Sequence, residues 1–325
     1  MLRARGGRST AKRILACAAA AALAACGGGG GGGQEPVPAP GVSAPAAATA
    51  LELTSVTFTV VSSGAVTSIR WQKDGADLAD GTDASGAVVS GASTPTLALA
   101  ELPLAWSGAS FRAVVSGPGG SATSAAAALT VEPRALTFFH TDFEEAALVP
   151  ELAPGQAAID GVQLYAGLGG AVKFAGHFLR SPTGNTVTLT LAGLPSHQSV
   201  DVLFLFAAID SLDGTGTYPQ GDFFRVDVDG TPFFRESFAN ATASQVQSYV
   251  PPVGVELARR VNLGFGGPDG YYTDSAYDLG ADPRFSGIPH TAATLTVTFV
   301  IEGPGIQDLA DESWAMDELR VVLHR

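Results

Sequence analysis

The sequence has few cysteines and little charge. Cys17 and Cys26 are the only cysteines among 325 residues, and both precede the stretches with the patterns of folded structure. A chain without a cysteine pair in its folded part has no disulfide framework, so packing or a metal ion must stabilise it. Charged residues make up 15% of the chain, whereas 40 Gly and 20 Pro indicate turn-rich β structure.

Several catalytic motifs are also absent. The sequence contains no Gly-x-Ser-x-Gly, no His-Glu-x-x-His, no phosphate-binding loop and no dinucleotide fingerprint. These absences argue against a serine hydrolase, a zinc protease of that type and a nucleotide-binding enzyme. The five histidines are scattered, and we interpret each as a structural or surface residue: His140, His177, His197, His290 and His324.

Basic residues are scarce outside the N-terminal segment. The formal charge is −13, and removal of the first 25 residues, with their five basic and no acidic side chains, changes it to −18. Nucleic acid and anionic lipid surfaces would repel so acidic a chain. Divalent cations are the more natural small partners.

The N-terminus has the pattern of a signal peptide over residues 1–25. A basic start is followed by the short, alanine-rich apolar run 14–25, which is too short to span a membrane as a helix. Its end, Leu23-Ala24-Ala25-Cys26, resembles the lipobox of bacterial lipoproteins. The resemblance implies that Cys26 is lipidated and attaches the chain to the lipid bilayer, and Gly27 after it favours the outer membrane.

Residues 26–50 predict a tether, because an unbroken glycine run is followed by a proline-rich stretch that forms no core. Residues 51–132 alternate apolar and polar side chains between turn signals, which predicts an antiparallel sandwich. The stretches beginning at Trp71 and Ser107 resemble a bacterial immunoglobulin-like domain. The resemblance implies that Trp71 is buried and that Phe111 takes the tyrosine-corner position; we interpret Trp106 as packing.

Residues 136–325 predict a larger antiparallel unit with about eight strands and no helix. The nearest helical candidate is the short stretch 144–148. This strand content fits a jelly roll. The fold class is therefore all-β: an immunoglobulin-like sandwich followed by a larger jelly-roll sandwich. The expected strands are 186–191, 200–206, 224–228, 233–238, 295–300 and 319–323.

The second unit resembles carbohydrate-binding and MAM-like jelly-roll modules. These open on a strand bearing Asp-Phe-Glu, here residues 142–144, and close on an acidic stretch with tryptophan, here residues 311–317. The resemblance implies a binding module rather than an enzyme.

Three carboxylates form the predicted metal site. Counting the last strand in twos places Asp317 on the apolar face of Leu319, and Asp142 and Glu144 on the first strand share a face with Phe138. Buried carboxylates are costly unless paired or metal-bound, and calcium accepts flexible oxygen cages. We predict that calcium binds Asp142, Glu144 and Asp317; an arginine-paired or hydrogen-bonded core edge and catalysis are the alternatives.

Two loops have open interpretations. Residues 210–222 place three carboxylates in a glycine-rich connection, either a second cation site or a solvated loop. Tyr271, Tyr272 and Tyr277 belong to an aromatic loop that either grips a ligand or folds down as a plug.

The sequence thus predicts a lipid-anchored outer-membrane protein whose jelly roll recognises a glycan or another surface ligand without catalysis, for example in adhesion. A surface glycan hydrolase or lyase with its acids in residues 136–325 is one alternative. A purely structural envelope protein is the other.

Overall fold

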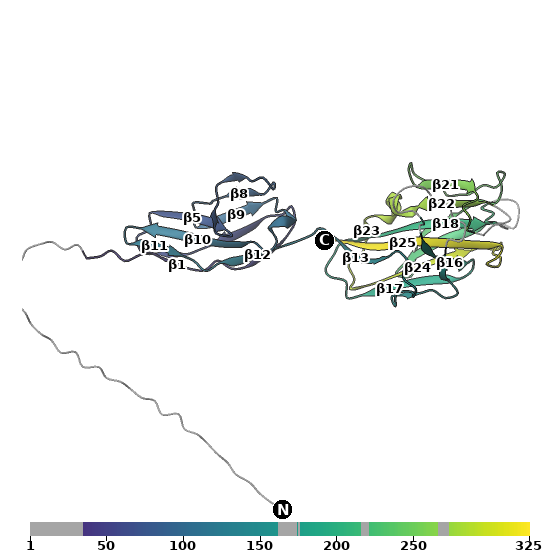
Figure 1. Ribbon diagram of the computed structural model, residues 1–325, viewed down its shortest axis with the longest axis horizontal. Coiled ribbons are helices and arrows are strands. Elements are labelled where there is room, and N and C mark those ends of the chain that lie inside the picture. Colours follow the sequence, from purple (N-terminus) through teal and green to yellow (C-terminus); the bar gives the residue numbers. More distant parts are fainter. Residues whose placement is uncertain (1–34, 162–173, 175, 216–220, 266–272) are drawn as a thin grey trace, which may run out of the picture.

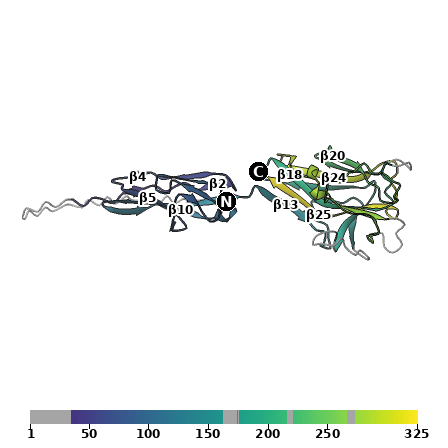
Figure 2. The same cartoon turned by 90° about the horizontal axis from the view of Figure 1, so that it is seen from above.

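A computed structural model describes residues 35–161, 174, 176–215, 221–265 and 273–325. Within these ranges every regular element is a β-strand or a short 3-10 helix (η), and no helix is long and apolar enough to cross a membrane. The strands form two groups along the chain (Figures 1 and 2). The predicted all-β fold class is confirmed.

The first group is an immunoglobulin-like sandwich of two main sheets, with β1 and β4 as a separate antiparallel pair. Strands β1 and β2 begin before residue 51, so the predicted tether boundary at residue 50 is too late. One sheet has the strand order β2-β12-β10-β5-β6 with β11 paired to β10, and the other has the order β3-β9-β8-β7. Pairing is antiparallel except between β2 and β12, which run parallel. The bounds are β1 Gly41–Val42, β2 Ala48–Leu51, β3 Val56–Thr59, β4 Ser62–Ser63, β5 Ser68–Lys73, β6 Ala76–Asp77, β7 Gly81–Thr82, β8 Val88–Ser90, β9 Thr96–Ala100, η1 Leu104–Trp106, β10 Ser110–Gly117, β11 Gly120–Thr123 and β12 Ala127–Glu132.

Aromatic side chains fill the core of this first sandwich. Trp71 is fully buried, as predicted, and Phe111 is fully buried as well. The Phe58 and Phe111 rings stack with centroids 4.9 Å apart, and the Trp106 ring lies 5.9 Å from that of Phe111. Trp106 is 4% exposed, so its predicted packing role is confirmed. These contacts replace the missing disulfide as the link between the sheets.

The second group is a larger sandwich of an eight-stranded and a five-stranded sheet. The first has the order β15-β16-β25-β18-β22-β21, with β13 paired to β25 and β23 to β18; the second has the order β14-β17-β24-β19-β20. The bounds are β13 Ala135–Thr141, β14 Leu152–Ala153, β15 Ala158–Gly161, β16 His177–Pro182, β17 Thr186–Ala192, β18 Ser199–Asp210, β19 Phe223–Val228, β20 Thr231–Ser237, β21 Glu256–Val261, β22 Asp274–Asp278, η2 Leu279–Ala281, η3 Pro283–Phe285, β23 Ile288–Pro289, β24 Thr294–Glu302 and β25 Glu312–His324.

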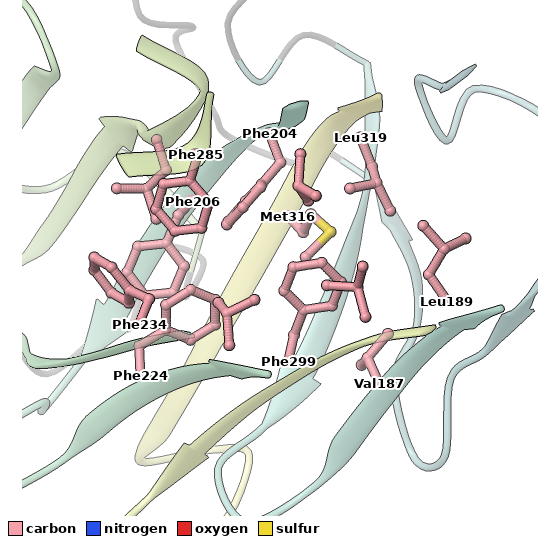
Figure 3. Packing of buried hydrophobic residues seen from close by; sticks show 14 of the residues in the cluster. Val187, Leu189, Phe204, Phe206, Phe224, Phe234, Phe285, Phe299, Met316 and Leu319 are labelled. Atoms are coloured by element: carbon pink, nitrogen blue, oxygen red, sulfur yellow. The ribbon is translucent and has the colours of Figure 1, made fainter. Parts of the chain in front are cut away.

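Alternating side chains build the core between these two sheets. In β17, Val187 and Leu189 are fully buried, whereas Thr186 and Thr190 face solvent. Phenylalanines from both sheets, among them Phe204 and Phe299, meet in the middle (Figure 3). All six strands expected from the sequence are present, and residues 144–148 form no helix.

The last strand, β25, lies at the centre of the eight-stranded sheet. One of its edges pairs with β18 and the other with β13 and β16. The first and last strands of this sandwich therefore run side by side, as predicted. The Arg325 amide donates to the Arg134 carbonyl at 2.9 Å, which places the last residue at the joint between the two groups.

Candidate functional site

Several predicted site residues lie outside the described residues or in the core. Cys26, Tyr271 and Tyr272 are outside the described residues. Tyr277 is fully buried in β22, and its hydroxyl donates to Gln247 Oε1 at 3.2 Å. A ring inside the core cannot meet a ligand, so the predicted ligand-binding role of Tyr277 is wrong.

Strand β25 contains a β-bulge at Asp317 and Glu318. Its register against β18 shifts between Leu203 and Leu205. Leu205 lies opposite Asp317, whereas Leu203 lies opposite Arg320, so β25 has one extra residue over this span. Glu318 adopts a left-handed φ of 52°, and its amide donates to Asp317 Oδ1 at 2.7 Å.

The bulge reverses the alternation of side chains along β25. Met316 and Leu319 both belong to the main core between the sheets (Figure 3). Strict alternation would have put these two residues on opposite faces. Asp317, next to Met316, therefore lies on the outer side of the sheet, and the predicted shared face of Asp317 and Leu319 is wrong. The extra residue in β25 is the physical reason.

The three carboxylates of the predicted calcium site do not come together as ligands. In the part of the chain that the structure describes, they are not in any group of three or more carboxylate, imidazole or thiol groups with ligand atoms mutually within 4.8 Å. Asp142 Oδ1 accepts from the Glu144 amide at 3.2 Å, and Glu144 Oε1 accepts from the His177 amide at 2.9 Å. The geometry therefore does not support calcium at Asp142, Glu144 and Asp317.

Asp317 is nevertheless electrostatically unusual. It is 3% exposed. Burial raises its pKa to about 7, the amide of Glu318 opposes this increase, and the charges of Glu318, Glu144 and Asp142 add to it.

A groove of about 500 Å³ lies beside the bulge on the outer face of the eight-stranded sheet. Leu203 and Leu205 form its apolar floor, because their neighbours in β18 point into the core instead. Gly280 and Ala281 of η2 form one side. The volume lies in the range of small-ligand sites.

Polar groups converge on this groove from three strands, and Asp278 of β22 is one of them. His140 of β13 lies opposite Arg320 of β25. His140 Nε2 is 2.9 Å from Glu318 Oε2, and Arg320 Nε is 4.0 Å from the same oxygen. Both His140 and Arg320 keep side chains more than two-fifths exposed, so they remain accessible to a ligand. The bulge brings Glu318 to this edge of the groove.

A larger hollow of about 590 Å³ lies near the edge of the five-stranded sheet. Among the described residues, Glu151 is the only charged side chain that lines it. Because ligand sites combine apolar walls with several converging polar groups, the groove at Glu318 is the better candidate.

A separate acidic group lies at the other end of β25. Oxygen atoms of Asp213, Asp222 and Glu312 all lie within 4.8 Å of one another, the only such group of three among the described residues. Glu312 begins β25 of the eight-stranded sheet. Asp213 lies in the connection after β18 and forms an isolated bridge with Ala239. Asp222 immediately precedes β19 of the five-stranded sheet. The group thus connects the two sheets.

Two of these carboxylates are buried and Asp213 is partly buried, and none has a cationic partner among the described residues. Glu312 and Asp222 are 0% and 1% exposed. In the described ranges no lysine or arginine forms an ion pair with any of the three. Burial raises the pKa of Glu312 to about 8 and that of Asp222 to about 6, and it also raises the pKa of Asp213. Neighbouring carboxylates add to each increase.

Hydrogen bonds satisfy this acidic group only in part. Asp222 Oδ2 accepts from the Asp213 amide at 2.7 Å, and Gln307 donates to both oxygens of Glu312 at 3.0 and 3.2 Å. Gln245 donates to Asp213 Oδ1. Asp222 Oδ1 is buried and has no hydrogen-bond partner in the part of the chain that the structure describes. An unpartnered buried carboxylate oxygen is rare in a folded protein, and a water or an ion commonly satisfies such an atom.

Sequence reasoning identified this group only in part. The glycine-rich stretch 210–222 predicted either a cation site or a solvated loop, and its acids Asp213 and Asp222 are the ones that converge. Glu312 lies about 90 residues further along the chain. No sequence signal linked it to them, because their proximity depends on the packing of the two sheets.

Comparisons with known proteins add little to this geometry. No protein-family model matches the chain, and no curated protein matches it. Among solved structures, the Ig1-2 module of the Drosophila receptor protein tyrosine phosphatase DLAR matches at 15% identity and a TM-score of 0.23, over 31% of this chain and 56% of that one. The titin domains Z1Z2 in complex with telethonin match at 15% identity and a TM-score of 0.30, over 82% of this chain and 98% of that one. The chain thus spans little more than half of the DLAR module.

Proposed function

We propose that this protein is a lipid-anchored component of a bacterial cell envelope that recognises a glycan or a related surface ligand without catalysis. The observation that carries the proposal is the groove at the bulge of β25, where His140, Glu318 and Arg320 surround a floor of leucines.

The chemistry of the groove fits a sugar. A pyranose ring has an apolar C–H face, which can pack on Leu203 and Leu205, and a rim of hydroxyl groups. Glu318 accepts hydrogen bonds from hydroxyls, and Arg320 donates them with a planar, permanently charged group. Charged partners give the stronger hydrogen bonds, so these two side chains would fix the orientation of the sugar.

Attachment to the envelope is supported by the N-terminal sequence. The lipobox-like end at Cys26 and the glycine- and proline-rich stretch after it suit a lipid anchor followed by a tether. The immunoglobulin-like sandwich would then act as a spacer that holds the second sandwich away from the membrane.

A glycan array with the purified soluble protein tests the proposal. Arg320→Ala should weaken binding to any captured glycan about tenfold, the effect expected for one important polar contact. Arg70→Ala, which removes an exposed arginine of the first sandwich, should leave binding unchanged. Release of sugar from a captured glycan would instead support the hydrolase or lyase. No binding to any glycan would favour a purely structural envelope protein.

A further inference from the structure

We propose that Asp213, Asp222 and Glu312 bind a divalent cation of the calcium class, and that this ion links the two sheets of the second sandwich. The inference does not depend on the proposed glycan recognition. It concerns a different end of β25 and a different set of side chains.

The burial of two of the three carboxylates is the first reason. Taking an ionised carboxylate out of water costs several kcal/mol unless a partner compensates it. Asp222 and Glu312 are at least 99% buried, and no lysine or arginine of the described residues pairs with them. A bound cation is the compensation that this arrangement leaves open.

The second reason is an atom of this group that lacks a partner. Asp222 Oδ1 is buried and makes no hydrogen bond with the described residues, although the other oxygen of the same carboxylate accepts from the Asp213 amide. Nearly all buried polar atoms find a partner. Since Asp222 is one of the three converging side chains, a cation between them would supply the partner that Oδ1 lacks.

The donor atoms indicate which kind of cation. All three side chains offer oxygen, and no histidine or cysteine belongs to the group. Oxygen-only sites suit hard cations such as calcium and magnesium rather than zinc. Calcium forms bonds of about 2.3–2.6 Å in flexible geometry, so it can bridge oxygens up to 4.8 Å apart. Magnesium needs shorter bonds and near-octahedral order.

The position of the group gives the cation a structural role. Glu312 shares a face of β25 with Trp314, and Asp222 shares a face of the other sheet with Phe224. The rings of Trp314 and Phe224 lie 5.5 Å apart in the core. Glu312 and Asp222 therefore lie next to this contact between the sheets, just outside the aromatic core. A cation there would hold the sheets together in a module without a disulfide.

Thermal melting in calcium and in chelator tests the site. For extracellular-type dissociation constants of about 10⁻⁴–10⁻³ M, 1 mM calcium should raise the Tm of the second sandwich by about 1–6 °C. Asp222→Asn and Glu312→Gln keep the side-chain shape but remove charge. Each should abolish the calcium response. In chelator, a Tm of either variant above that of wild type would show that the variant still folds.

Asp317→Asn is the matched control, because it removes another buried carboxylate from the same strand. It should keep the full calcium response. Terbium provides a second readout: its luminescence, sensitised by Trp314, should appear with wild type and Asp317→Asn but not with Asp222→Asn.

Four results would overturn the proposal. The first is an unchanged wild-type Tm between calcium and chelator, and the second is no terbium emission. The third is loss of the calcium response in Asp317→Asn with retention in Asp222→Asn. The fourth, an equal shift with magnesium, would overturn the assignment to calcium. The outcome of the glycan array with Arg320→Ala does not depend on any of these four results.

Discussion

Replacement of Asp317 by Asn should stabilise the second sandwich at alkaline pH. The carboxyl group is 3% exposed, and burial together with neighbouring carboxylates raises its pKa from 3.8 to about 7. An acid with a raised pKa in the folded state binds its proton more tightly there than in the unfolded chain. The folded state therefore loses stability as the pH rises from about 4 through 7.

The magnitude follows from the two pKa values. The difference between a pKa of 3.8 and one of about 7 lowers the free energy of unfolding by about 4 kcal/mol at pH 8 and above, where Asp317 is ionised in both the folded and the unfolded state. At pH 5 Asp317 is still protonated in the folded state, and the loss in the free energy of unfolding is about 2 kcal/mol. Asn cannot ionise, and its side-chain oxygen can still accept from the Glu318 amide. Asp317→Asn should therefore increase the free energy of unfolding, relative to wild type, more at pH 8 than at pH 5.

Denaturant unfolding of wild type and variant at pH 5 and pH 8, with chelator present, measures this difference. Glu145→Gln removes an exposed carboxylate near Glu144 and should change stability little at either pH. If Asp317→Asn were no more stable than wild type at pH 8, the carboxylate would have compensation that the described contacts do not provide. The electrostatic reasoning for β25 would then fail.

Two further predictions concern the organisation of the chain. Cys26→Ser should move the protein from the membrane pellet to the soluble fraction, and retention in the pellet would contradict the lipid anchor. Residues 136–325 expressed alone should melt in one cooperative transition, because their core clusters contain no residue of the first sandwich. An aggregated or molten product would place the domain boundary elsewhere.

The strands were predictable from the sequence because alternation is local. Val187 and Leu189 are spaced two apart, and this spacing alone indicates which face of β17 is buried. The same reasoning failed at Asp317. A bulge adds one residue against a partner strand, and its position depends on pairing with β18 rather than on the residues of β25 alone.

The candidate sites depended still more on tertiary structure. The sequence identified the acids of the stretch 210–222 as a possible cation site. Glu312 joins them only because the two sheets stack. Tyr277 shows the opposite error. Its place in a stretch rich in tyrosine suggested a ligand contact, whereas β22 pairs with β18 and places the ring in the core.

The central position of β25 has a consequence for the order in which the protein can fold. Ribosomes make this strand after all the others described, yet β13, β16 and β18 all pair with it. Until residue 324 has been synthesised, the eight-stranded sheet lacks the strand that joins its two halves. The first sandwich is complete after β12 and can fold earlier. The second must wait for contacts between residues far apart in the chain, which makes its folding intrinsically slow. Loss of even a few residues within β25 should therefore prevent the sandwich from closing, whereas trimming the tether should not.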